Sequence, residues 1–304
     1  MSNPSPPLKT KVKDVLNEAR ILVLGTQVLL GFQFQARFRP GFARLPAESQ
    51  WASLASLMLI YLALMLLIAP AAYHRIADEG DDSSVLKHLA GRAIDVALPL
   101  LAGSLGLDIA LTSVRIVGNA AAIALGVLVL LLALGFWVGM GIAHRRGDRV
   151  RTNKREKSSL EEKIQTLLTE SRVILPGAQA LLVFQLAAML TDKFDRLPEH
   201  LRQIHLGSLL LIAIAIILLI SPAAYHRLAA DGEPREDVDA FGAKAVLGAL
   251  VPLALALCGD LYIVAAMQPG SHRWALVLAV AALTGFILLW GVFPVAARHW
   301  RRQS

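Results

Sequence analysis

Long apolar stretches alternate with short polar ones along the whole chain. Eight of these stretches approach or exceed the length of a membrane span, because about 20 apolar residues cross a bilayer as a helix. They lie at about 21–36, 51–73, 89–111, 116–143, 173–190, 204–225, 240–267 and 274–297. Backbone groups in lipid must form internal hydrogen bonds, so each stretch is predicted to be helical. The pattern therefore indicates an all-α polytopic membrane protein with eight transmembrane helices.

The second half of the chain repeats the first at a spacing of 152 residues. The hexapeptide Pro70–Arg75 returns unchanged as Pro222–Arg227, and each copy ends a long apolar stretch. A period of this length indicates a duplicated domain rather than a solenoid unit. We predict the following organisation: a disordered tail at 1–12, a four-helix repeat at 13–144, a basic linker at 145–160, a second four-helix repeat at 161–299 and a basic tail at 300–304.

An even number of spans in each half brings both repeats into the membrane from the same side. We therefore expect two parallel four-helix bundles, related by a pseudo-two-fold axis along the membrane normal. Of the 30 lysines and arginines, 22 belong to the side that holds the tails and the linker, and 8 to the other side. Positive residues favour the cytoplasm. The expected location is the plasma (inner) membrane of a bacterium, with both termini and the linker in the cytoplasm.

Composition narrows the class of protein further. Hydrophobic residues make up 56% of the chain and charged residues only 17%, against roughly 25% charged residues in soluble domains. The net charge is +7, but the basic residues lie in loops and tails without a nucleic-acid-binding motif. We therefore expect anionic lipid at the linker and tails, and no nucleic acid.

Common motifs for catalysis and metal binding are absent from the sequence. All eight histidines lie at span ends or in loops, and no His-Glu-x-x-His, Walker loop or Gly-x-Ser-x-Gly occurs. One cysteine, Cys258, forms neither a disulfide framework nor a metal cluster. The sequence therefore predicts no enzyme, no metal and no cofactor.

Charged residues are concentrated at the inner ends of the first two spans of each half. They are Glu18, Arg20, His74 and Arg75 in the first half, and Glu170, Arg172, His226 and Arg227 in the second. A buried charge requires a partner, so we predict an inner-side polar cluster in each half. The alternative is simple anchoring, in which the arginines extend to lipid headgroups and suit the C-terminal end of a helix dipole.

Two aspartates are candidate coupling carboxylates. Asp108 and Asp260 each lie 16 residues after a basic residue at the inner end of a span, which is about 24 Å of helical rise. This places both in the outer part of the membrane, where carboxylates are rare and mark ion or proton paths. The alternative is that they lie near enough to the outer surface to contact water, Arg115 or Arg273.

Amide side chains occur within the first span of each half. They are Gln27 and Gln33 in the first half, and Gln179 and Gln185 in the second. Amides inside a membrane usually hydrogen-bond to a neighbouring helix. The alternative is that these glutamines line a polar path through the bundle.

The repeated motifs resemble a known family. They are Glu-x-Arg with a following Gln at the first span, Leu-Pro between the first two spans, and Pro-Ala-Ala-Tyr-His-Arg at the end of the second. Each half resembles a family of small bacterial four-span membrane proteins with no established function. Members usually look like single copies, whereas this chain carries two in tandem. Some members bear the label sodium:proton antiporter, and the resemblance implies no catalytic residues.

Two functions of different classes remain open. The first is a small secondary transporter or cation/proton exchanger that uses Asp108 and Asp260. The second is a non-transporting membrane scaffold or sensor that acts through the basic linker. A hydrated pocket that reaches either aspartate would favour transport, and solid packing of Leu and Ala around them would favour a scaffold.

Overall fold

The computed structural model describes residues 8–135, 137, 155–156, 159–228, 235–268 and 272–303. The first half comprises α1 (Leu8–Ala36), α2 (Pro40–Ala43), α3 (Ala47–Ile76), β1 (Asp82–Ser83), α4 (Ser84–Val117) and α5 (Asn119–Leu134). The second half comprises β2 (Arg155–Glu156), α7 (Leu160–Met189), α8 (Asp192–Asp195), α9 (Glu199–Leu228), α10 (Glu236–Ala266), α11 (His272–Phe286), the π-helical segment η2 (Ile287–Val292) and α12 (Phe293–Gln303). Apart from the short β1–β2 pair, the described chain is all-α, as the sequence predicts.

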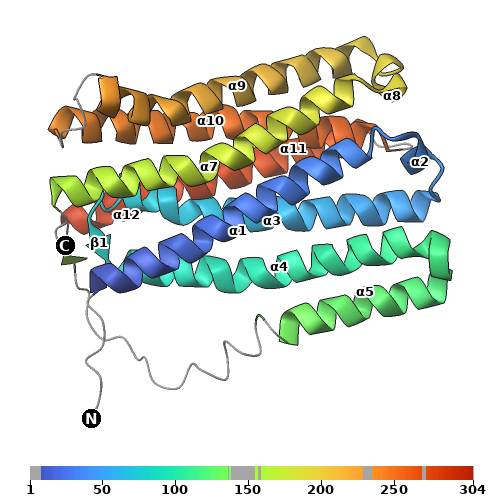
Figure 1. The fold of residues 1–304 in the computed structure, drawn as a ribbon, viewed down its shortest axis with the longest axis horizontal. Coiled ribbons are helices and arrows are strands. Elements are labelled where there is room, and N and C mark those ends of the chain that lie inside the picture. The colour runs from blue at the N-terminus through green and yellow to red at the C-terminus, as the bar shows by residue number, and fades with distance from the viewer. Residues whose placement is uncertain are drawn as a thin grey trace.

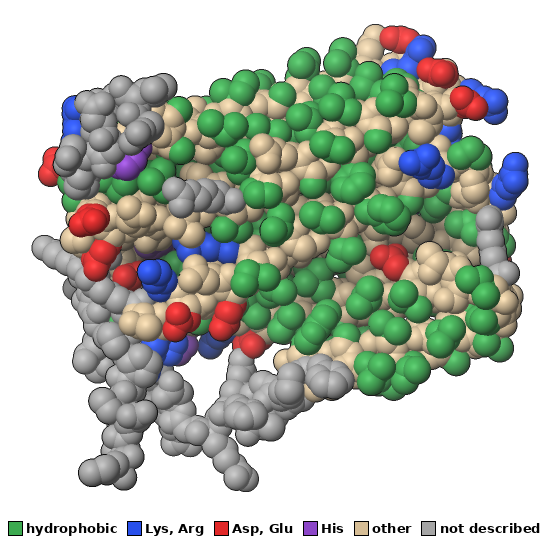
Figure 2. All heavy atoms as spheres, in the orientation of Figure 1, with side chains coloured by type: hydrophobic (Ala, Val, Ile, Leu, Met, Phe, Trp, Pro, Cys, Tyr) green, Lys and Arg blue, Asp and Glu red, His purple; other side chains and the backbone are tan. Residues whose placement is uncertain are grey.

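Seven helical segments in the described chain are long and apolar enough to cross a membrane. They are α1, α3, α4, α7, α9, α10 and the continuous segment from α11 to α12. Charged side chains gather at the two ends of the bundle, and hydrophobic side chains cover most of the face between them (Figure 2). The arrangement indicates a membrane protein. The eighth predicted span, 116–143, extends outside the described residues, and its described part, α5, is shorter than the others.

The two halves repeat the same packing. In the first half α3 packs along α4 and α1 contacts both, and in the second half α9 packs along α10 and α7 contacts both. The halves meet where α1 and α7 run side by side (Figure 1). This contact brings the first span of each repeat to the interface between the halves.

The fourth spans of the two halves have different neighbours. The segment from α11 to α12 packs on α10 and also on α3 of the first half, where Trp290 Nε1 donates to the carbonyl of Met65 at 2.9 Å. In contrast, α5 packs along α4, and a Cβ on Gly126 would lie 2.5 Å from the carbonyl oxygen of Gly106. The two glycines allow these helices to approach closely. Because the fourth spans pack differently, the described contacts do not establish the pseudo-two-fold symmetry, which stays a prediction.

One end of the bundle holds the connections that the sequence assigns to one side of the membrane. The starts of α1 and α7, the β1–β2 pair and the end of α12 lie there, and α2 and α8 lie at the opposite end (Figure 1). Strand β1 pairs antiparallel with β2, with Asp82 opposite Glu156. Helix α7 begins with a capping box, because Ser159 and Glu162 each accept a hydrogen bond from the other's backbone N–H, at 3.3 and 2.8 Å.

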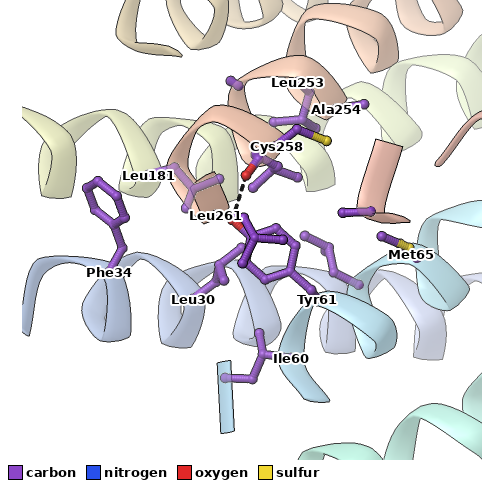
Figure 3. Close-up of a cluster of buried hydrophobic side chains, with 14 of the residues drawn as sticks. Leu30, Phe34, Ile60, Tyr61, Met65, Leu181, Leu253, Ala254, Cys258 and Leu261 are labelled. Atoms are coloured by element: carbon purple, nitrogen blue, oxygen red, sulfur yellow. Dashed lines mark hydrogen bonds between the residues drawn. The ribbon is translucent and has the colours of Figure 1, made fainter. Parts of the chain in front are cut away.

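The hydrophobic core is continuous across the two halves. Leu30 and Ile60 from the first half lie in the same cluster as Leu253 and Leu261 from the second (Figure 3). Within this core the hydroxyl of Tyr61 donates to the carbonyl of Leu257 at 2.8 Å. The halves are therefore joined by an interior that resembles the core of one domain.

Candidate functional site

Asp108 on α4 lies in a polar cluster formed by three helices of the first half. Gln33 Nε2 from α1 donates to Asp108 Oδ2 at 2.5 Å, and Ser56 Oγ from α3 donates to Asp108 Oδ1 at 2.8 Å. Ser104, one turn before Asp108 on α4, has its Oγ 2.8 Å from Ser56 Oγ. Asp108 is half-buried, and Gln33 and Ser56 are buried. The structure thus brings two residues predicted from sequence, Gln33 and Asp108, into direct contact.

The second half contains the same arrangement. Gln185 Nε2 from α7 donates to both carboxylate oxygens of Asp260 on α10, at 2.7 and 2.6 Å. The hydroxyl of Ser208 on α9 also hydrogen-bonds to this carboxylate. Asp260 is only 3% exposed, so it contacts these partners rather than water or Arg273.

These residues correspond pair by pair between the halves. Gln185, Ser208 and Asp260 lie 152 residues after Gln33, Ser56 and Asp108. We call each set the Gln–Ser–Asp triad. Sequence reasoning missed the two serines, because a single hydroxyl in an apolar stretch gives a weak signal. The repeat spacing would have paired them.

Each triad can accommodate a carboxylate or a carboxylic acid. No described Lys or Arg lies within ion-pair distance of either aspartate. The Oε1 atoms of Gln33 and Gln185 are buried and have no hydrogen-bond partner in the described structure. A carboxylate accepts from the amide nitrogen, and after the amide turns over, a carboxylic acid can donate to the amide oxygen. The triads are therefore suited to binding and releasing a proton.

An arginine lies one turn outward of the first triad. Arg37 is 1% exposed; its Nη2 donates to Ser53 Oγ at 3.2 Å, and its guanidinium carbon lies 5.2 Å from the ring centroid of Phe42. Burial lowers the pKa of Arg37 to about 10, and the negative charge of Asp108 opposes this shift. Sequence reasoning missed Arg37, because it follows the end of the first span and resembles an ordinary loop residue.

Arg37 is also contacted by the second half. Lys193 Nζ donates to the carbonyl of Arg37 at 2.7 Å and lies 5.5 Å from the ring centroid of Phe42. Burial and the charge of Arg37 lower the pKa of Lys193. Two cations from different halves therefore lie close together at the end of the bundle that holds α2 and α8.

A histidine occupies the corresponding place in the second half. His205 lies 152 residues after Ser53 and is fully buried. Its ring stacks on Phe34 with centroids 5.9 Å apart and meets Phe194 edge-on at 5.0 Å. His205 Nε2 lies 3.2 Å from the carbonyl oxygen of Gln185. A neutral aromatic box thus replaces the arginine beside the second triad.

The inner-side charges form one cluster that joins the two halves. Glu170 on α7 accepts from Arg75 Nε at 2.7 Å, lies 3.0 Å from His74 Nδ1 and lies 3.9 Å from Arg20 Nη2. Glu170 is 2% exposed. We call these four residues the inter-repeat cluster. The expectation of a separate cluster within each half is wrong, because the packing of α7 along α1 places Glu170 at the end of α3 in the other half.

The remaining predicted members lie outside this cluster. Glu18 is exposed on α1 and His226 is half-exposed on α9. The side chains of Arg172 and Arg227 are outside the described part of the structure. Arg75 has a second acidic neighbour instead, Asp239 on α10, with Nη1 and Oδ1 3.6 Å apart.

The other two predicted glutamines are not equivalent to each other. Gln27 is fully buried against Gly177, and neither of its amide atoms has a hydrogen-bond partner among the described residues. Gln179, the corresponding residue of the second half, is exposed. The predicted path-lining role is thus not shared by the pair.

The cavities of the described structure include one small space and two larger grooves. One of about 20 Å³ lies beside the inter-repeat cluster and is lined in part by Arg20 and Glu170, which is room for about one water. The other two are apolar grooves between α10 and α11. None of the three is lined by Asp108 or Asp260.

Fold and site together define an all-α protein with seven candidate membrane-spanning helices and a Gln–Ser–Asp triad in each of two tandem repeats. The chain belongs to the family described as "Family of unknown function (DUF6328)", whose model matches residues 5–141 and again residues 153–294. The two tandem matches are consistent with a duplicated domain. No curated protein and no solved structure matches the chain.

Proposed function

We propose that the protein is a small secondary transporter that exchanges a cation for protons. The observation that carries this proposal is the carboxylate inside each Gln–Ser–Asp triad, Asp108 and Asp260, surrounded by apolar helices. A carboxylate is costly in such a place. Asparagine would form comparable hydrogen bonds without a charge to desolvate. The presence of an acid in both copies therefore supports a role that requires ionisation.

Proton and cation would compete for the same carboxylate. When the aspartate loses its proton, the negative charge can be balanced by a cation, and proton binding then displaces that cation. The triad also offers the amide oxygen of Gln and the hydroxyl oxygen of Ser as neutral ligands, and oxygen ligands of this kind suit hard cations. Competition at one site couples the two fluxes in opposite directions.

The proposal includes the full membrane arrangement. We place eight spans in the bilayer, with α5 continuing through the predicted span 116–143, and both termini and the 145–160 linker in the cytoplasm of a plasma (inner) membrane. The support is the common location of the start of α1, the β1–β2 pair and the end of α12 at one end of the bundle (Figure 1). The basic residues of this end would contact anionic lipid.

Transport can be tested in proteoliposomes that carry an imposed pH gradient and an internal pH dye. Na⁺, K⁺ or Li⁺ is added outside, and wild type is compared with the double variant Asp108→Asn, Asp260→Asn. The matched control is Glu18→Gln, Glu48→Gln, which removes two exposed carboxylates. We expect cation-dependent collapse of the gradient in wild type and control, and its loss in the double variant.

The opposite result would favour the second class of function. If folded wild-type protein gives no response with any of the three cations, the exchange proposal is wrong. A scaffold or sensor that acts through the basic linker would then be the better explanation, in line with the solid packing around Asp260.

A further inference from the structure

The two triads differ in the residue that lies one turn outward of them. In the first half, Arg37 follows Gln33 by four residues in the turn that continues from the end of α1, where its N–H donates to the carbonyl of Phe34. Ser53 precedes Ser56 by three residues on the antiparallel helix α3. Residues three or four apart lie on the same helix face. The Arg37–Ser53 hydrogen bond is therefore stacked on the Gln33–Ser56 contact, about 6 Å further out along the helices.

The second half has no cation at this place. Met189 and His205 occupy the positions that correspond to Arg37 and Ser53. His205 makes its hydrogen-bonding contact with the backbone of Gln185 and is otherwise enclosed by the rings of Phe34, Phe38 and Phe194. The first triad therefore has a positive neighbour, whereas the second has the imidazole of His205, and Met189 at the position of Arg37 is exposed.

The other described groups that face the two aspartates leave the difference in charge between the two sites unchanged. The titratable groups around Asp260 are Tyr61 from α3 and Cys258 from α10, together with His205 from α9, and Gln185 is the neighbour from α7. None of these is a lysine or an arginine. Asp108 faces Arg37 at the end of α1, and its neighbours from α3 and α4 are neutral serines.

Building on the proposed exchange, we propose that Asp260 is the carboxyl group that takes up and releases the proton, whereas the charge of Arg37 favours the ionised form of Asp108. A nearby opposite charge favours the ionised form of a carboxyl group, and burial without such a charge favours the neutral acid. Asp260 is the more deeply buried of the two and lacks the cation. Arg37 is then a positioning residue that has made the two duplicated sites different, so that one proton moves per chain in each cycle.

A hydrophobic carbodiimide reports this difference without any transport measurement. Dicyclohexylcarbodiimide reacts with a protonated carboxyl group in an apolar setting: the acid proton moves to a carbodiimide nitrogen, the carboxyl oxygen bonds to its central carbon, and rearrangement leaves a stable N-acylurea. The full-length protein in liposomes is treated near neutral pH, and peptide mapping by mass spectrometry measures the label on Asp108 and on Asp260.

We expect about tenfold more label on Asp260 than on Asp108, since Arg37 lies beyond ion-pair distance of Asp108 and the lower end of the effect of an opposite charge on a carboxyl group is about tenfold. Met189 corresponds to Arg37 in the second repeat, so each residue can be replaced by the other. Arg37→Met should raise the label on Asp108 toward that on Asp260. Met189→Arg should lower the label on Asp260 by about tenfold. Equal labelling of the two aspartates in wild type, or no label on Asp260, would overturn the proposal.

The variant Arg37→Lys distinguishes the effect of the positive charge from the effect of the guanidinium contacts on the fold. This variant keeps a cation beside the first triad, and Asp108 should stay unlabelled even if the guanidinium contacts with Ser53 and Phe42 are lost. Labelling of Asp108 in folded Arg37→Lys protein would contradict the assigned role of the charge. If the label pattern is as expected but liposomes show no exchange, the asymmetry stands and the transport proposal fails.

Discussion

Replacing Glu170 by glutamine is expected to lower the free energy of unfolding by about 3 kcal/mol. Glu170 is buried and carries the only carboxylate within 3 Å of Arg75 Nε and His74 Nδ1 in the described structure. Glutamine preserves the size of the side chain but removes its charge. The guanidinium of Arg75 would then remain buried with Asp239 as its one acidic neighbour, 3.6 Å away.

The magnitude follows from the burial of both partners. Breaking a buried ion pair by removing one partner costs about 3–5 kcal/mol. The lower end applies here, because Asp239 remains close to Arg75 and glutamine keeps one oxygen acceptor. With about 2–4 °C of melting temperature per kcal/mol in chains somewhat smaller than this one, the expected decrease is on the order of 6–12 °C. Thermal unfolding of detergent-purified protein, followed by tryptophan fluorescence, measures it.

The duplicated sequence supplies the control for this experiment. Glu18 is the residue that corresponds to Glu170 in the first repeat, and it is exposed. Glu18→Gln should therefore change the free energy of unfolding by no more than about 0.5 kcal/mol. If the two glutamine variants melt at the same temperature, the inter-repeat cluster does not hold the halves together and the reasoning is refuted.

Two further predictions also use corresponding positions in the repeats or opposite ends of the bundle. Gly177→Ala should lower the free energy of unfolding by about 1–3 kcal/mol, because its Cβ would overlap the side chain of Gln27. In Gly25→Ala, the same change in the first repeat, the new Cβ meets no atom within 4 Å. This variant should raise the free energy of unfolding by up to about 1 kcal/mol. Equal effects of the two variants in a melting experiment would contradict the packing between α1 and α7. In a Cys258→Ser background, a membrane-impermeant maleimide added outside intact cells should label Asp192→Cys and leave Glu18→Cys unlabelled, and the reverse pattern would show that the orientation is inverted.

The hydropathy pattern predicts the helices well, because lipid permits few alternatives to a helix in each apolar stretch. It predicts their ends less well. Helix α1 begins at Leu8 and α7 at Leu160, far before the apolar stretches start, since polar residues outside lipid can continue a helix. The spacing along α4 and α10 also placed the two aspartates at similar depths, which allowed them to be recognised as one kind of site.

Contacts between the repeats could not be predicted from the pattern within each repeat. The inter-repeat cluster depends on how α1 and α7 pack side by side, and it joins Arg75 to a residue 95 positions later in the chain. Arg37 lies just beyond an apolar stretch, and only the arrangement of α1, α3 and α8 shows that it is buried. The sequence likewise places His205 at a span end. Its contacts with Phe34, Phe38 and Phe194 could not be predicted, because two of these rings belong to the other half of the chain.

The most direct test of the central claim is cation-driven proton movement in proteoliposomes that contain wild type, Asp260→Asn, or the control variant Glu18→Gln, Glu48→Gln. The control variant removes two exposed carboxylates outside the triads. We predict that wild type and the control variant dissipate an imposed pH gradient when Na⁺, K⁺ or Li⁺ is added, and that Asp260→Asn does not. Full activity of folded Asp260→Asn would contradict the account.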